Sequence, residues 1–285
     1  MAADEGAELV VLASGFSLVE CPRWREGALW FAEWGPGEIL RLDPDGRMSV
    51  AARAGAPPLS FDFLPDGRML VVAAGERRLL RLGAAGALEP HADLSHLPAM
   101  GWNEIVVDGR GNTYVNGGGL GPAAGGAAPG VIALVTPDGR ARQVADDIAF
   151  PNGRAVTTDN ATLIIAESWR SRLTAFDIGP DGDLSGRRVW ADLPGAPDGI
   201  CLDAEGACWV ASVPLGACLR VGEGGKPLGE VKLDRGAFAC VLGGPDRRTL
   251  YITAARWFGM DRMSEMDGTG KVLAARAAVA GVGWP

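Results

Sequence analysis

Residues 38–46 read Glu-Ile-Leu-Arg-Leu-Asp-Pro-Asp-Gly, an alternating run that ends in a tight-turn signal. Asp-Gly pairs tolerate the positive φ angles that tight hairpins require. The same Pro-Asp-Gly triplet returns at 65–67, 137–139 and 180–182. This stretch therefore predicts a β-hairpin, and its recurrence predicts a chain built from many hairpins.

Other short apolar or alternating runs are bounded by similar turns, and we expect strands over 28–31, 69–72, 105–107, 131–135 and 163–165. Every second turn heads a similar segment, which gives a unit of roughly 40–50 residues, the size of a four-stranded propeller blade. A chain of 285 residues holds about six such units. The sequence predicts an all-β, six-bladed β-propeller of four-stranded antiparallel blades, with residues 1–285 forming a single domain.

The composition agrees with many short elements. Glycine (42) and proline (19) are frequent, and 47% of the residues are hydrophobic, which excludes intrinsic disorder. A parallel α/β sheet would need long amphipathic helices, and the one alanine-rich candidate, 272–280, is interpreted as a closing strand that shares a blade with 10–12. The glycine-rich stretch 117–130 is interpreted as a long loop over one rim.

The net charge and the lack of targeting signals limit the classes of partner and the location that we expect. The net charge of −8 disfavours nucleic acid and anionic membranes as partners. No apolar run is long enough for a membrane helix, and the start lacks a basic signal region, so a cytoplasmic protein with a small-molecule substrate is expected. The five cysteines form no CxxC pair and are interpreted as small core residues.

Aligning the inner hairpins on their turn residues exposes one column of polar side chains. Equivalent positions on the inner strands of a propeller face the same axis, so these side chains are expected to converge. The column contains Glu20 (seven residues before Gly27), Asn103 (eight before Gly111), Asn152 (eight before Asn160) and Asp198 (eight before Gly206), while the other two repeats offer Phe61 and Ala239.

Two carboxylates and two amides at one point need a counter-charge, since buried like charges repel or take up a proton. A divalent cation would supply it. Hard oxygen donors without thiolate or imidazole favour calcium, magnesium or manganese over zinc. Calcium is the first choice, with zinc, magnesium and manganese as alternatives. A simpler interpretation is that these residues only cap turns at strand ends.

Several motifs resemble the regucalcin, gluconolactonase and luciferin-regenerating-enzyme family over nearly the whole chain. They are Glu20-Cys-Pro-Arg-Trp24, Trp102-Asn-Glu104, Pro151-Asn-Gly153, Pro197-Asp-Gly199 and the terminal Gly283-Trp-Pro285. The resemblance implies a six-bladed propeller with one catalytic divalent metal in its central tunnel. By position, Glu20, Asn152 and Asp198 look like metal ligands. Asn103 looks like a fourth polar residue that contacts the metal, the substrate or water.

Two departures from the family pattern stand out. Cys21 replaces a usual glycine, which we expect to matter little. Gly101 stands where related chains often carry an arginine that hydrogen-bonds a hydroxylated sugar lactone. Aromatic residues near strand or loop ends are candidates for the substrate pocket, and they are Trp34, Trp102, Phe150, Trp169 and Trp257. The missing arginine and these rings favour a substrate less polar than a sugar lactone.

The sequence therefore favours a metal-dependent lactonase-like hydrolase of a small cyclic ester, with Asp198 as the general base and Asn103 as a second catalytic residue. One alternative is a phosphotriester or fluorophosphate hydrolase that uses the same metal site. Another is a non-catalytic binding propeller whose cation only holds the blades together.

Overall fold

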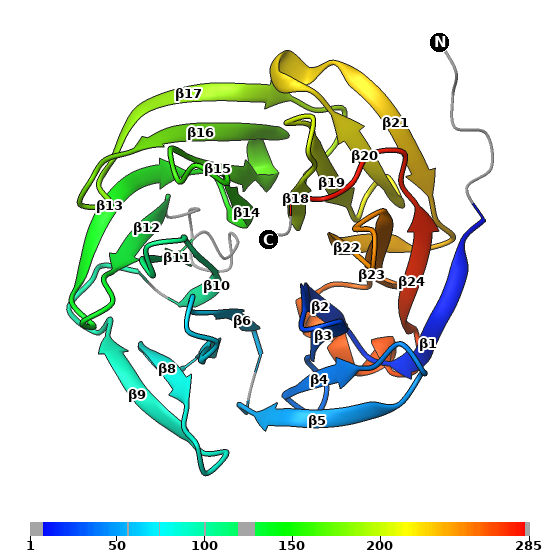
Figure 1. The fold of residues 1–285 in the computed structure, drawn as a ribbon, viewed down its shortest axis with the longest axis horizontal. Coiled ribbons are helices and arrows are strands. Elements are labelled where there is room, and N and C mark those ends of the chain that lie inside the picture. Colours follow the sequence, from blue (N-terminus) through cyan, green and yellow to red (C-terminus); the bar gives the residue numbers. More distant parts are fainter. Residues whose placement is uncertain (1–7, 56, 74, 100, 119–128, 283–285) are drawn as a thin grey trace.

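The computed structural model describes residues 8–55, 57–73, 75–99, 101–118 and 129–282. Over these residues the chain forms six four-stranded sheets arranged in a ring (Figure 1). All strand pairs within the blades are antiparallel, for example Glu38 opposite Arg53 and Leu29 opposite Leu42. The six-bladed propeller predicted from the turns is confirmed.

The innermost strand of each blade lies beside the central axis. These strands are β2 (Val19–Arg25), β6 (Leu59–Phe63), β10 (Trp102–Val107), β14 (Pro151–Val156), β18 (Ile200–Leu202) and β22 (Gly236–Gly243). The second strands are β3 (Ala28–Glu33), β7 (Met69–Ala73), β11 (Thr113–Gly117), β15 (Thr162–Glu167), β19 (Cys208–Ser212) and β23 (Thr249–Ala255). The predicted turns at 65–67, 108–111 and 203–206 join strands of this kind, whereas the Pro-Asp-Gly turns at 44–46, 137–139 and 180–182 join the two outer strands of their blades.

The third and fourth strands form the outer half of each blade, and the fourth strands are the most exposed. The third strands are β4 (Glu38–Leu42), β8 (Arg78–Leu82), β12 (Gly130–Val135), β16 (Arg172–Ile178), β20 (Ala217–Val221) and β24 (Gly270–Arg276). The outermost strands are β5 (Met48–Arg53), β9 (Leu88–Asp93), β13 (Ala141–Ile148), β17 (Leu184–Asp192), β21 (Pro227–Lys232) and β1 (Val10–Phe16). Short 3₁₀ helices are η2 (Ser168–Arg170), η3 (Glu223–Gly225) and η4 (Met260–Met266).

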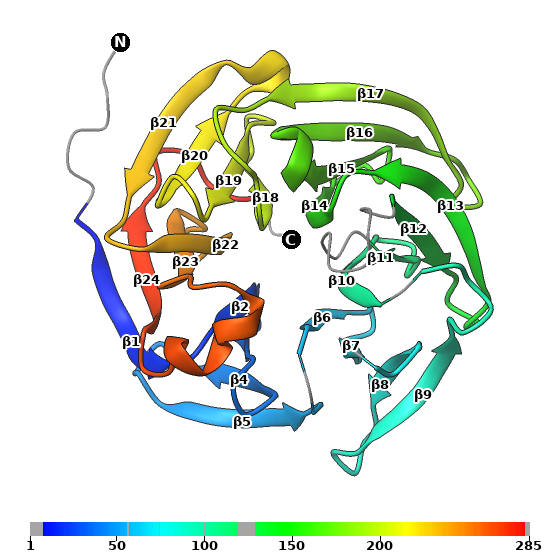
Figure 2. The ribbon, with the colours of Figure 1, turned by 180° about the vertical axis from the view of Figure 1, so that it is seen from behind.

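The ring is closed by pairing the first strand with the last. β1 lies antiparallel to β24, with Val10 opposite Ala274 and Val11 opposite Leu273, and both views show the two strands side by side (Figures 1 and 2). The predicted closure is confirmed, although the strand predicted over 272–280 ends at Arg276. The pairing covers an edge that β24 would otherwise expose.

The core is divided among the contacts between neighbouring blades. One cluster joins the first two blades through Phe61, Phe63 and Trp34, and another joins the last and first through Val19 and Tyr251. All five cysteines are buried and free, as predicted. Among the described residues, no helix is long and apolar enough to cross a membrane. The terminal motif 283–285 and most of the predicted loop over 117–130 lie outside the described residues.

Candidate functional site

A cavity of about 420 Å³ lies where the innermost strands converge. All four polar residues of the sequence column line it, each contributed by a different blade. The remaining lining residues are Leu18, Trp34, Pro58, Glu104, Phe150, Ser168, Trp169, Ala196, Pro197, Val213, Pro214, Phe238 and Trp257. The structure thus brings Glu20, Asn103, Asn152 and Asp198 to one mostly apolar cavity, of a size that suits a small organic ligand.

β-Bulges turn the inner strands toward this cavity. Trp102 pairs with Gly117 and Ile105 pairs with Val115, so Asn103 and Glu104 together face a single residue of β11. A similar bulge in β14 includes Asn152. In β2 the bulge begins directly after Glu20. Bulges re-aim side chains next to active sites, which explains why residues at equal distances from their turns meet on the axis.

Close backbone packing fixes the blades around Asp198. A Cβ on Gly153 would lie 2.4 Å from the Asp198 carbonyl oxygen, and one on Gly199 would lie 2.3 Å from the Ala239 Cβ. The Gly199 NH donates to the Phe238 carbonyl oxygen at 2.7 Å. The glycines of the Asn-Gly and Asp-Gly motifs are therefore required for neighbouring inner strands to approach.

The carboxylates of the cavity are buried and poorly compensated. Glu20 is 5% exposed and Glu104 is 8% exposed, and the Asp198 Oδ1 atom is buried without a hydrogen-bond partner. Burial raises the pKa of Glu20 well above its usual range, and the charges of Asp198 and Glu104 raise it further. Burial likewise raises the pKa of Asp198, again reinforced by Glu104. The protein holds these acids together at an electrostatic cost.

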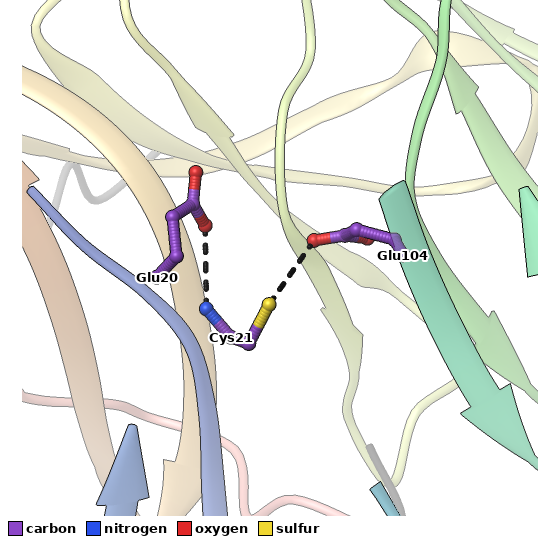
Figure 3. Close-up of side chains that lie close together, drawn as sticks. All are labelled: Glu20, Cys21 and Glu104. Atoms are coloured by element: carbon purple, nitrogen blue, oxygen red, sulfur yellow. Dashed lines mark hydrogen bonds between the residues drawn. The ribbon is translucent and has the colours of Figure 1, made fainter. Parts of the chain in front are cut away.

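Glu104 is the member of the site that the sequence analysis missed. It directly follows Asn103 in β10, and its equivalents in the other five blades are Cys21, Asp62, Gly153, Gly199 and Cys240. An acidic residue just before the apolar run Ile105-Val-Val was the available signal. In the structure Glu104 lies opposite Glu20, with the Cys21 sulfur 3.6 Å from its Oε1 atom (Figure 3).

Two arginines and one aspartate accompany these acids. Arg23 forms an ion pair with Asp62, with 3.3 Å between Nε and Oδ1, and donates to the Ile105 carbonyl oxygen. Arg154 is 3% exposed and donates to the Tyr114 carbonyl oxygen at 2.7 Å. Burial lowers the pKa of Arg154 to about 9, although the charge of Glu104 opposes this effect.

The charges in this central group do not cancel. The four carboxylates are Glu20, Asp62, Glu104 and Asp198, and they face the guanidinium groups of Arg23 and Arg154. Full ionisation would leave two negative charges in a low-dielectric setting, which a divalent cation would neutralise. The oxygen donors, the unpartnered Asp198 Oδ1 and the charge balance all fit such an ion.

Aromatic side chains form much of the cavity wall. Phe150 stacks on Trp169 with ring centroids 5.2 Å apart, and Phe238 meets Trp257 edge-on at 5.6 Å. Trp169 and Trp257 are 46% and 41% exposed, so they stand at the rim. Trp34 is buried in the wall, and its indole NH donates to the Leu59 carbonyl oxygen.

Trp102 does not join this wall, contrary to the sequence prediction. It is 2% exposed and packs in the hydrophobic cluster around Leu94 and Ile105. Its indole also covers Gly117, where a Cβ would lie 2.7 Å from the ring. Neighbouring residues on a strand point to opposite sides, so Asn103 faces the cavity and Trp102 faces the core between blades.

Comparison with known proteins identifies relatives over the whole propeller. Residues 18–256 match the SMP-30/gluconolactonase/LRE-like region. The 6-deoxy-6-sulfogluconolactonase of Pseudomonas putida is 29% identical over 294 aligned positions, covering 94% of each chain.

Solved structures agree with the fold. A luciferin-regenerating enzyme superimposes with a TM-score of 0.83 at 20% identity, covering 98% of each chain. A calcium-binding protein, regucalcin, from Agrobacterium tumefaciens superimposes with a TM-score of 0.78 at 24% identity, covering 96% of this chain and 95% of the other.

Proposed function

The chain belongs to the SMP-30/gluconolactonase/LRE-like family, and from this premise we propose that it is a divalent-metal-dependent lactonase. The observation that carries the proposal is the buried, unpartnered Asp198 Oδ1 beside Glu20 and Glu104 in an aromatic-walled cavity. Buried carboxylates with so few hydrogen-bond donors call for a cation, and the wall offers room for a small ester.

Glu20, Asn103, Asn152 and Asp198 would hold the cation, and the buried Glu104 carboxylate would offer a further oxygen ligand. The calcium-binding relative supports calcium, while the oxygen donors also suit magnesium, manganese or zinc. When bound, the cation supplies Lewis-acid polarisation of the ester carbonyl.

Asp198 is the proposed general base. Its free oxygen would accept a proton from the attacking water, whose hydroxyl adds to the carbonyl carbon. The ring C–O bond then breaks, and the proton passes to the leaving oxygen to give a hydroxy acid. The Asn103 side chain would position the ester or the water through a hydrogen bond.

The wall supports an ester with apolar surface. Trp169, Trp257 and Phe150 offer ring faces and edges, and Gly101, where related chains often carry an arginine, offers no side-chain donor to a hydroxylated substrate. The relative that hydrolyses a sulfogluconolactone supports lactone chemistry. We therefore propose a substrate less polyhydroxylated than a sugar lactone.

Hydrolysis of a lactone panel by metal-reloaded protein tests the proposal. Protein stripped with chelator is reloaded with calcium, magnesium, manganese or zinc, and acid release is followed for alkyl, aromatic and sugar lactones. We expect metal-dependent turnover, with higher kcat/KM for the less polar rings. Absence of turnover with every metal would refute the lactonase. A higher kcat/KM for gluconolactone than for every apolar lactone would refute the substrate preference.

A further inference from the structure

The Cys21 sulfur lies between two buried carboxylates. One ligand atom from each of Glu20, Cys21 and Glu104 can be chosen so that all three lie within 4.8 Å of one another (Figure 3). All three residues are more than nine-tenths buried. Glu20 and Cys21 belong to β2 and Glu104 to β10, so two blades build this group.

The spacing of sulfur and oxygen suits a tetrahedral ion. Bonds of about 2.3 Å to sulfur and about 2.1 Å to oxygen, at a tetrahedral angle, separate the two ligand atoms by about 3.6 Å. The Cys21 Sγ atom and the Glu104 Oε1 atom are 3.6 Å apart. One edge of a tetrahedral coordination shell is therefore already present.

The other cysteines differ from Cys21 in their surroundings. Cys201, Cys218 and Cys240 lie together in one hydrophobic cluster, and Cys208 lies in the next. Their sulfurs contact backbone carbonyls, as for Cys208 to Trp209 and Cys240 to Gly199, or one another, as for Cys240 with Cys201 and Cys218. Within the described residues, Cys21 is the cysteine whose sulfur contacts a carboxylate.

The carboxylates beside the sulfur accept few hydrogen bonds. Glu20 accepts one hydrogen bond, from the Cys21 NH to Oε2 at 3.2 Å, and Glu104 accepts only the weak bond from the thiol among the described residues. Independently, the Asp198 Oδ1 atom from a third blade is buried without a partner, and its charge acts on Glu20. Unpaired buried carboxylates are costly unless they coordinate a metal.

We propose that Cys21 supplies a sulfur ligand to the cation held by Glu20 and Glu104, so that the centre prefers a thiophilic divalent ion such as zinc over calcium. Thiolate ligands select zinc and other softer ions, whereas calcium takes oxygen ligands. On binding, the thiol proton leaves to solvent and a sulfur–metal bond replaces the S–H bond. The inference rests on the cation-binding part of the proposed function and is independent of ester hydrolysis.

Cadmium and zinc titrations of the chelator-stripped protein test the inference. The matched variants are Cys21→Ser, which keeps the size but replaces the sulfur, and Cys208→Ser, which changes a buried cysteine remote from the carboxylates. We expect cadmium to produce a sulfur-to-metal charge-transfer band in the parent and in C208S, but not in C21S. X-ray absorption of the zinc form should show a sulfur neighbour at about 2.3 Å that C21S lacks.

The metal affinities of the parent and C21S distinguish a direct ligand from a residue that only lies near the metal. Loss of an outer partner costs about 10–100-fold in metal affinity, so C21S should weaken zinc by more than about 100-fold. Its calcium affinity should change by less than about tenfold, because serine offers an oxygen of similar reach. The dissociation constants for zinc and calcium are measured by competition with a chromophoric chelator.

Either spectroscopic result can overturn the inference. A parent protein without the charge-transfer band, or a band of equal strength in C21S, would remove Cys21 from the coordination shell. If C21S fails to fold, Cys21→Gly serves instead, because the φ of 51° at this position suits glycine. Lactone hydrolysis is measured on the same samples: sulfur ligation without turnover refutes the lactonase alone, and turnover without sulfur ligation refutes only the inference.

Discussion

A Cβ atom on Gly153 would lie 2.4 Å from the Asp198 carbonyl oxygen, although the two residues are on different blades. The residue after one proposed ligand therefore determines how closely the strand carrying another can approach. Because this contact is with backbone, no side-chain rearrangement can relieve it.

Gly153→Ala should therefore destabilise the fold and disturb the site. Overpacking of this kind costs about 1–3 kcal/mol, and we expect metal affinity to fall as the inner strands separate. Chemical denaturation and metal titration measure the two effects. Gly229→Ala is the matched control, since its Cβ would meet only Arg220 at 3.8 Å. Equal stability of G153A and G229A would contradict the packing argument.

Asp198→Asn separates a catalytic role from a purely structural one. The amide keeps an oxygen donor but cannot accept a proton, so turnover should fall by more than about 100-fold even at saturating metal. Thermal stability should largely recover as metal is added, by mass action. Asp45→Asn, at an exposed turn, serves as the control. Near-parental kcat in D198N at saturating metal would leave Asp198 as a ligand only.

The stability of the metal-free protein should depend on the acids of the cavity. Burial raises the pKa of Glu20 and Asp198 in the folded state above the unfolded values, so the folded state binds protons more tightly. Their contribution to stability is therefore greatest below the unfolded pKa and is lost as pH rises through the raised values. Added metal should raise Tm more at pH 8 than at pH 5, since protons compete for the same oxygens.

Thermal melts with chelator or metal across this pH range test the sign. The variant carrying both Glu20→Gln and Asp198→Asn should show a smaller metal effect and a flatter metal-free profile. A metal-induced rise in Tm that is larger at pH 5 than at pH 8 would contradict the proposed ligands.

The contribution of Glu167 to stability should depend on pH in the opposite direction. Burial opposes its ionisation, but the Ala149 NH, the Thr174 hydroxyl and the Arg172 guanidinium together lower its pKa to about 2. Its stabilising effect is therefore present above the unfolded pKa and is lost as pH falls toward about 2. Glu167→Gln should lower Tm at pH 7 and have a smaller effect near pH 2, as measured by calorimetry. An equal loss at both pH values would indicate that packing, and not charge, is responsible.

Substitution of Trp257 tests the proposed preference for an apolar substrate. Removing its ring in Trp257→Ala should raise KM for an aromatic lactone by about tenfold, or about 1.4 kcal/mol, with a smaller effect on kcat. Phe258→Ala is a close control, because Phe258 is 37% exposed and does not line the cavity. Steady-state kinetics would contradict the assignment if both variants changed KM equally.

The fold could be predicted from the sequence because recurring turn residues mark its repeat. Pro-Asp-Gly triplets require tight hairpins wherever they occur, and their spacing fixes the size of a blade. The site column followed from the same regularity, since Asn103, Asn152 and Asp198 lie at one distance from their turns. Pairing of β1 with β24 followed from the need to cover an open edge.

The remaining features depend on β-bulges and on contacts between blades, which one sequence alone does not reveal. Glu104 enters the cavity because a bulge presents it together with Asn103, whereas the residues that follow Glu20, Asn152 and Asp198 are cysteine or glycine. Trp102 adjoins Asn103 in the sequence, but alternation along β10 directs its ring into the core between blades. The carboxylate neighbour of Cys21, Glu104, comes from another blade, so the sequence around Cys21 predicts only a packing residue.

The pairing of β1 with β24 also constrains how the protein is made. Val10 pairs with Ala274, so β1 has no native partner until the strands of all the intervening blades have been synthesised. Contacts of such large sequence separation form slowly and leave apolar surface exposed. Val10, Val11 and Leu12 remain 40–50% exposed even in the closed ring. An apolar strand therefore stays unpaired while the blades between β1 and β24 are synthesised, which makes that strand the natural segment for a chaperone to hold.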